Sequence, residues 1–79
     1  MVVSFHPNFE KTIRKIKDKS LKEQIKKQIR KVIENPEIGK PMKYARKGTR
    51  ELYIKPYRLS YTFIKDNIIF LDLYHKDKQ

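Results

Sequence analysis

A chain of 79 residues has room for one small domain but not for a second hydrophobic core. It contains no cysteine, which excludes disulfide bonds and thiolate metal sites, and its four Phe and five Tyr argue against a disordered chain. Twenty Lys and Arg against nine Asp and Glu give a net charge of +11, which favours a polyanionic partner, usually a nucleic acid.

A membrane surface is the competing polyanion. The longest apolar run, residues 68–71, is far too short to span a bilayer, and no helix has the apolar Trp and Phe face of an interfacial anchor. No signal peptide opens the chain, because polar residues and Pro7 follow residues 1–3 at once. We therefore expect a cytoplasmic protein that does not bind membranes.

The N-terminal quarter predicts a strand and then a helix. Residues 2–5 (VVSF) have strand propensity and are stopped by His6 and Pro7, the latter suited to the first turn of a helix. Apolar residues then recur at helical spacing: Phe9, Ile13 and Ile16. For His6, between the two elements, we expect a role in local structure.

A second helix is predicted to begin at Ser20, where Glu23 completes a capping box. Its apolar stripe consists of Leu21, Ile25, Ile29, Val32 and Ile33, with lysines and arginines elsewhere around it. Asn35 and Pro36 end the helix, Asn35 as a left-handed cap. The two helices then form an antiparallel hairpin.

Residues 36–49 predict a loop, because they contain two prolines and both glycines. After it the hydrophobic period changes from 3.6 to 2, which predicts three strands separated by turns. Their inward-facing residues are expected to be Leu52 and Ile54, then Tyr57, Leu59, Tyr61 and Phe63, and finally Ile69, Leu71 and Leu73.

The last two strands can pair through a two-residue or a three-residue turn. A three-residue loop at 65–67, with Asn67 left-handed, pairs Leu59 with Leu73 and Tyr61 with Leu71, and it keeps one face apolar. This register places polar residues together on the opposite face: Arg58, Ser60, Asp72 and Tyr74, with Tyr53 and Lys55 beside them. The predicted fold is a single α+β domain of order β-α-α-β-β-β, with a mostly antiparallel sheet and a two-helix hairpin on one face.

Three stretches, NPEIGKPMK, RELYIKPYRLSYTF and IIFLDLYHK, resemble the RelE/ParE superfamily of toxin–antitoxin toxins. The shared pattern is a helical hairpin ending in Asn-Pro, a Gly-Lys-Pro loop, a Tyr-Arg at the head of a central strand and a basic final strand. The likeness covers almost the whole chain. It implies a compact α+β fold and usually an mRNA endonuclease acting on the ribosome, or, in the ParE branch, an inhibitor of DNA gyrase.

The resemblance also implies roles for single residues. Arg58 matches the arginine that contacts the scissile phosphate in the RNase branch. His75 and Lys76 match the first two of the three basic residues, the closing basic triplet, with which the family's final strand ends. Asp77 stands where the family often has a base, and the tyrosine that commonly follows in active enzymes has no counterpart.

The strand before Tyr-Arg also departs from RelE proper. The lysines that RelE carries there are replaced by Glu51 and Tyr53 or shifted to Lys55.

Cleavage of RNA without a metal needs a base, an acid and a fixed positive charge for the pentacoordinate phosphate. Arg58 suits the charge role, because a guanidinium forks onto phosphate oxygens and does not deprotonate. Its structural alternative is a contact to Asp72 or stacking on Tyr74. In either case its side chain should point away from the helices, so Arg58→Ala should cost only about 0.5 kcal/mol.

Other candidates are weaker. His75 is a candidate for the acid or base, because histidine is the side-chain type best suited to that role, but alternation places it on the face of Leu71 and Leu73, which favours a strand-end role equally. Lys55 and Lys76 are further candidates for contacts to the phosphate, and Tyr53 and Tyr74 for stacking on bases. Basic residues expected to hold the RNA backbone are Lys40, Lys43, Arg46, Lys47 and Arg50. Two histidines without clustered carboxylates predict no metal site, and we expect no cofactor.

The sequence therefore supports two hypotheses. The first is a ribosome-dependent mRNA endonuclease toxin, with an antitoxin and ribosome-bound mRNA as partners and a heterotetramer with the antitoxin as one assembly. The second is a non-enzymatic module, either a ParE-like gyrase inhibitor or an inactive toxin homologue. The altered closing triplet favours the second hypothesis, and Arg58 with Lys55 and His75 favours the first.

Overall fold

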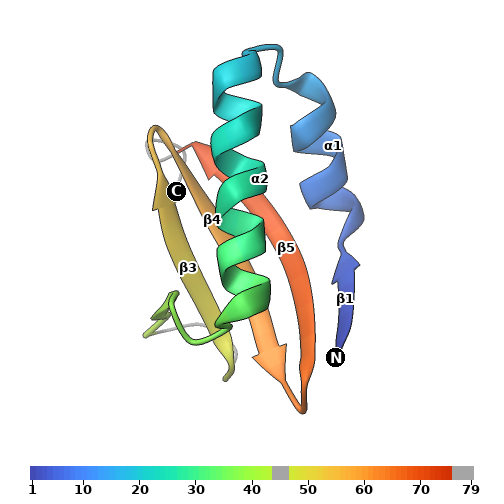
Figure 1. Ribbon diagram of the computed structural model, residues 1–79, viewed down its shortest axis with the longest axis vertical. Helices are drawn as coiled ribbons and strands as arrows, with labels where there is room; N and C mark the ends of the chain where they lie inside the picture. The colour runs from blue at the N-terminus through green and yellow to red at the C-terminus, as the bar shows by residue number, and fades with distance from the viewer. Residues whose placement is uncertain (44–46, 76–79) are drawn as a thin grey trace.

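The computed structural model describes residues 1–43 and 47–75 of the chain. In this part, two helices cover one face of a five-stranded sheet of order β1-β5-β4-β3-β2 (Figure 1). The elements are β1 (Val2–Phe5), α1 (Pro7–Lys15), α2 (Lys19–Glu34), β2 (Lys40–Pro41), β3 (Thr49–Ile54), β4 (Tyr57–Ile64) and β5 (Asn67–His75). Only β1 pairs in parallel, with β5. The predicted α+β class, helical hairpin and mostly antiparallel sheet are confirmed.

The segment predicted as one long loop contains a short strand, β2, that was not predicted. Lys40 and Pro41 pair with Glu51 and Arg50 at the edge of the sheet. The Arg50 guanidinium fastens this edge, because it donates hydrogen bonds to the carbonyl oxygens of Glu37, at 2.9 Å, and Gly39, at 2.7 Å. A two-residue strand held in this way has no periodic sequence signal.

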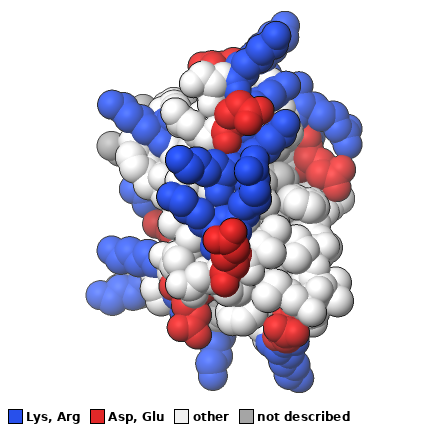
Figure 2. Space-filling view, in the orientation of Figure 1, with Lys and Arg blue, Asp and Glu red and all other residues white. Residues whose placement is uncertain are grey.

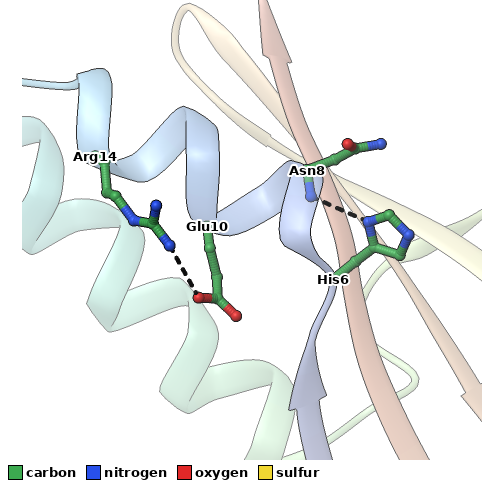
Figure 3. Close-up of polar contacts among 4 residues, drawn as sticks. All are labelled: His6, Asn8, Glu10 and Arg14. Atoms are coloured by element: carbon green, nitrogen blue, oxygen red, sulfur yellow. Dashed lines mark hydrogen bonds and ion pairs between the residues drawn. The ribbon is translucent and has the colours of Figure 1, made fainter.

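His6 has the local role expected for it, as the N-cap of α1. Its Nδ1 accepts a hydrogen bond from the backbone N–H of Asn8 at 3.0 Å, and Pro7 occupies the first turn (Figure 3). One turn later, Arg14 pairs with Glu10 at 3.5 Å on the exposed side of the helix. The helix therefore satisfies its first free N–H group through its own sequence.

The predicted capping box at Ser20 is wrong. Asp18 caps α2, because its Oδ1 accepts from the backbone N–H groups of Ser20, at 2.9 Å, and Leu21, at 3.2 Å. A carboxylate at this position satisfies two free donors and also complements the helix dipole, so the helix starts at Lys19. At the other end the helix stops at Glu34 as predicted, but Asn35 has a φ of −144° and is not left-handed.

The β4–β5 hairpin differs from the predicted register. Its turn has two residues, Lys65 and Asp66, both with positive φ, so the three-residue loop with a left-handed Asn67 is wrong. Leu59 pairs with Leu73 as predicted. Tyr61, however, pairs with Phe70 instead of Leu71, because the register shifts between Ser60 and Tyr61.

This shift corrects the predicted core of β5. An extra residue in one strand reverses the alternation beyond it. Ile68 and Phe70 are fully buried on one side of the shift and Leu73 is buried on the other, whereas Ile69 is 37% exposed. The prediction that Ile69 and Leu71 face the helices together with Leu73 is therefore wrong.

Tyr61 links the core to the segment after α2. Its ring is completely buried, and its hydroxyl donates to the Pro36 carbonyl oxygen at 2.7 Å while accepting from the Gly39 N–H at 2.9 Å. A Cβ on Gly39 would lie 2.5 Å from that hydroxyl oxygen, so only glycine permits the close approach. The hydroxyl thus positions the chain that leads into β2.

No helix in the described ranges is long and apolar enough to cross a membrane.

We predict that Tyr61→Phe lowers the free energy of unfolding by about 2 kcal/mol, because two buried backbone groups lose their partner. Burial, the largest effect, raises the pKa of Tyr61 above 10.0, although the Gly39 hydrogen bond and Arg50 oppose it. Since the folded pKa exceeds the unfolded one, the hydroxyl's contribution is complete below pH 10 and is lost as the pH rises through the raised value.

Urea denaturation at several pH values measures the difference between the variant and the wild type. Tyr57→Phe is the control, because its hydroxyl makes no hydrogen bond within the described residues. The prediction would be contradicted if Tyr57→Phe and Tyr61→Phe lost the same free energy of unfolding. It would also be contradicted if the difference in free energy between Tyr61→Phe and the wild type grew above pH 10.

Candidate functional site

The face of the sheet away from the helices carries a polar cluster near the C-terminal end of β5. Strand pairing sets Arg58 between Tyr53 and Tyr74, and Ser60 between Glu51 and Asp72. Paired residues share a face, and Leu59, between Arg58 and Ser60, points into the core. The prediction that Arg58, Ser60, Asp72 and Tyr74 lie together on this open face is therefore confirmed.

Glu51 is the ionic partner of Arg58. Nη1 of Arg58 donates to Oε1 of Glu51 at 2.9 Å, and the two side chains are 32% and 20% exposed. Asp72, the partner expected from the sequence, instead accepts a hydrogen bond at Oδ1 from the backbone N–H of Leu73 at 2.8 Å. From the sequence, Glu51 was expected only as a residue that replaces a lysine, although an acid among basic residues such as Arg50 and Lys55 is a signal for an ion pair.

Tyr74 joins the same carboxylate. Its hydroxyl donates to Oε2 of Glu51 at 2.9 Å. Burial raises the pKa of Tyr74, the hydrogen bond to Glu51 and its charge raise it further, and Arg58 lowers it. Tyr74 therefore stays protonated at neutral pH and acts as a hydrogen-bond donor.

His75 lies on the other side of the sheet from Arg58. It pairs with Tyr57, and the two rings make an edge contact with centroids 5.6 Å apart. The ring borders a hollow of about 340 Å³ beside the C-terminal end of α1, with Lys15 and Ile16 on the opposite wall. The predicted shared face with Leu73 is confirmed, and the sheet separates this candidate acid or base from the guanidinium.

Two further candidates surround Arg58. Tyr53 is 54% exposed on the open face, where its ring can meet a base. Lys55 is exposed in the turn between β3 and β4. Lys76 lies outside the described residues, so its place relative to the cluster is not part of the site geometry.

The basic residues that were predicted to hold the RNA backbone divide into two groups. Lys40, Lys43 and Lys47 are exposed on and after β2, whereas Arg46 lies outside the described residues. Arg50 was predicted to contact RNA, but its Nη1 is occupied by the two carbonyl groups that fasten β2. Because Arg50 pairs with Tyr61 across the strands, it lies on the helix side of the sheet and not with Arg58.

Positive charge is not confined to the open face. Figure 2 shows Lys and Arg crowded over the helix side of the molecule. The basic residues of α2 are Lys19, Lys22, Lys26, Lys27, Arg30 and Lys31. Positive charge therefore does not by itself select a face for a polyanion, and the open face is distinguished by its fixed geometry.

Within residues 1–43 and 47–75, no three His, Asp or Glu side chains gather in a group that could hold a metal ion. The open face brings together the guanidinium of Arg58, the carboxylate of Glu51 and the protonated phenol of Tyr74.

A family model described as the ParE toxin of type II toxin–antitoxin systems, parDE, matches residues 3–79. The chain belongs to this toxin family. This confirms the resemblance to the RelE/ParE superfamily and establishes the protein as a type II toxin. No curated protein sequence matches the chain significantly.

Solved structures agree with this toxin's fold. The isolated E. coli RelE toxin has a TM-score of 0.80 and 22% identity, over 99% of this chain and 86% of that one. A chain of the intact E. coli RelBE toxin–antitoxin complex has a TM-score of 0.79 and 22% identity, over 94% of both chains.

We predict that Arg58→Ala lowers the free energy of unfolding by about 1–2 kcal/mol, more than the 0.5 kcal/mol expected from the sequence. The reason is that the mostly buried Glu51 carboxylate loses a charged partner. Urea denaturation measures the difference, with Arg14→Ala as the control, because its pair with Glu10 is exposed. Equal losses of unfolding free energy in Arg58→Ala and Arg14→Ala would show that the pairing of Glu51 with Arg58 adds no more stability than an exposed ion pair.

Proposed function

We propose that this toxin is a ribosome-dependent mRNA endonuclease that inhibits translation and is held inactive by an antitoxin. The observation that carries the proposal is the orientation of Arg58, which is held on an accessible sheet face by Glu51 next to Tyr74. A fixed guanidinium is what a pentacoordinate phosphate requires. The structural likeness to RelE supports the same choice.

In this proposal the RNA lies across the open face. Arg58 binds the scissile phosphate, Tyr53 stacks on a neighbouring base, and Lys55 contributes a further contact to the phosphate. The exposed Lys40, Lys43 and Lys47 hold the backbone on either side, with Arg46 in the same segment. Lys76, which follows His75 in the sequence, is the proposed acid or base, whereas His75 itself lies across the sheet from Arg58 and does not meet the same phosphate. Such a target places the protein in the cytoplasm.

A second function is favoured by two observations. The matching family model is that of ParE, and His75 lies across the sheet from Arg58. A gyrase inhibitor, or an inactive homologue that acts by binding alone, needs no acid and base on one face. Assays of translation and of gyrase supercoiling, run with the same purified protein, discriminate between these functions.

We predict that expression of the toxin without a partner arrests growth by blocking translation. Labelled amino acid incorporation should fall before DNA synthesis does, and mapping of mRNA 5′ ends should show new cleavage sites within translated regions. Normal growth at high levels of folded protein would contradict any toxic function. Inhibited supercoiling with intact mRNA would instead identify the gyrase inhibitor.

We predict that Arg58→Ala lowers the rate of mRNA cleavage on the order of 10²-fold or more, because a contact made in the transition state is lost. Arg58→Lys should rescue poorly, since an ammonium does not fork onto two oxygens. Lys43→Ala is the control and should weaken RNA binding only modestly, together with its salt dependence. Cleavage by folded Arg58→Ala at the wild-type rate would rule out this active site.

The antitoxin is proposed to bind the apolar groove between the helices or the edge of β5. The groove is bordered by Phe9, Ile13, Ile25 and Ile29, with Lys22 and Lys26 at its rim. Beyond Phe70, β5 has no strand beside it on the β1 side among the described residues. An acidic amphipathic helix or an added strand matches these features. A heterotetramer is one assembly that such binding allows.

We predict that the antitoxin raises the melting temperature of the toxin, because a ligand of the folded state stabilises it by about 2.7 kcal/mol at 100 times its Kd. Differential scanning calorimetry of the free toxin and of the purified complex measures the change. Ile29→Glu, placed in the groove, should abolish the rise in melting temperature if a helix binds there. An unchanged melting temperature of the wild-type complex would contradict the proposal.

A further inference from the structure

Glu51 connects the three strands that form the polar cluster. It lies on β3, and its two carboxylate oxygens accept from different strands: Oε1 from Arg58 on β4 and Oε2 from Tyr74 on β5, both at 2.9 Å. With both oxygens engaged, the carboxylate cannot rotate without breaking a hydrogen bond. The side chain is only 20% exposed, so water competes weakly for these contacts.

The contact with Glu51 engages only part of the Arg58 guanidinium, and the side chain stays 32% exposed. Nη1 is occupied by the carboxylate, whereas Nε is buried and has no hydrogen-bond partner in the described part of the chain. A buried donor without a partner is costly. Because Nε has no accessible surface, a phosphate would meet the exposed part of the guanidinium, whose planar fork suits two phosphate oxygens.

We propose that Glu51 is a positioning residue, which holds the Arg58 guanidinium in place for an RNA phosphate and is itself braced by the Tyr74 hydroxyl. This inference rests on the proposed RNA endonuclease function. An acid beside the phosphate site lowers the local positive potential. The benefit of Glu51 is that it orders the long, flexible side chain of Arg58 before RNA binds.

Two other roles for Glu51 make different predictions. As a counter-ion alone, it would only weaken RNA binding by neutralising Arg58. As a general base, it would take the proton of the 2′-hydroxyl and would need its negative charge for every turnover. A positioning residue needs its shape and hydrogen-bonding oxygen more than its charge.

Glu51→Gln and Glu51→Ala form a matched pair, because they remove the same charge and only the first keeps an oxygen for Arg58. With steady-state cleavage of ribosome-bound mRNA as the assay, we expect Glu51→Gln to keep most of the wild-type kcat. Glu51→Ala should lose on the order of 10²-fold in kcat without a higher KM, as expected for a misplaced catalytic group. Equally tighter RNA binding by both variants would show that Glu51 is a counter-ion alone. An equally large loss of kcat in both variants would show that Glu51 is a general base. Each of these results would overturn the proposal.

Two further variants control for charge and for folding. Asp72→Asn removes an acid from the same face without touching Arg58, because Asp72 contacts the Leu73 N–H, and its kcat should equal that of the wild type. Tyr74→Phe removes the brace while the charge stays unchanged. It should lower kcat with unchanged RNA affinity, so it tests the proposal even where Glu51→Ala does not fold. Unchanged kcat in Tyr74→Phe would overturn the role of the brace.

Nuclear magnetic resonance of the Arg58 Nε–H group tests the proposal without cleavage. The resonance should be sharp and slow to exchange in the wild type and Glu51→Gln, and broadened in Glu51→Ala. A 2′-O-methyl RNA oligonucleotide, which cannot be cleaved, should shift it in the wild type. An equally sharp signal in Glu51→Ala would overturn the positioning role. A sharp wild-type signal that RNA does not shift would instead contradict the RNA function.

Discussion

One extra residue in β5, at the step where the pairing changes from Tyr61–Phe70 to Ser60–Asp72, decides which side chains of this strand face the helices. On one side of the step, Ile68 and Phe70 enter the core, and on the other side Leu73 does. Without the shift, a strand of this length would turn either its first or its second half the wrong way. Both the core and the open face therefore depend on it.

The open face takes its chemistry from the half of β5 that follows this shift. There Leu73 faces the helices, so its neighbour Tyr74 points away from them and meets Glu51. His75, one residue further, returns to the helix side, where it contacts Tyr57. Alternation in this half of the strand brings Arg58, Glu51 and Tyr74 together and separates them from the histidine, and the shift allows Ile68 and Phe70 to enter the core as well.

A second set of contacts holds the edge of the sheet. The Tyr61 hydroxyl and the Arg50 guanidinium bind backbone groups of residues 36–39 from the helix side of β4 and β3. These side chains are polar, yet they serve the fold, because a segment without regular structure needs partners for its backbone groups. These contacts fix the segment that leads into β2, which begins at Lys40.

The sequence by itself determined the α+β class, the helical hairpin, the β4 alternation and the exposure of Arg58, because these follow from local hydrophobic periods of 3.6 and 2. It did not determine the cap at Asp18, the strand β2 or the β4–β5 register. Each of these depends on a hydrogen bond or a pairing chosen among close alternatives. The partner of Arg58 was likewise decided by tertiary structure, since Glu51 and Tyr74 reach each other only across three paired strands.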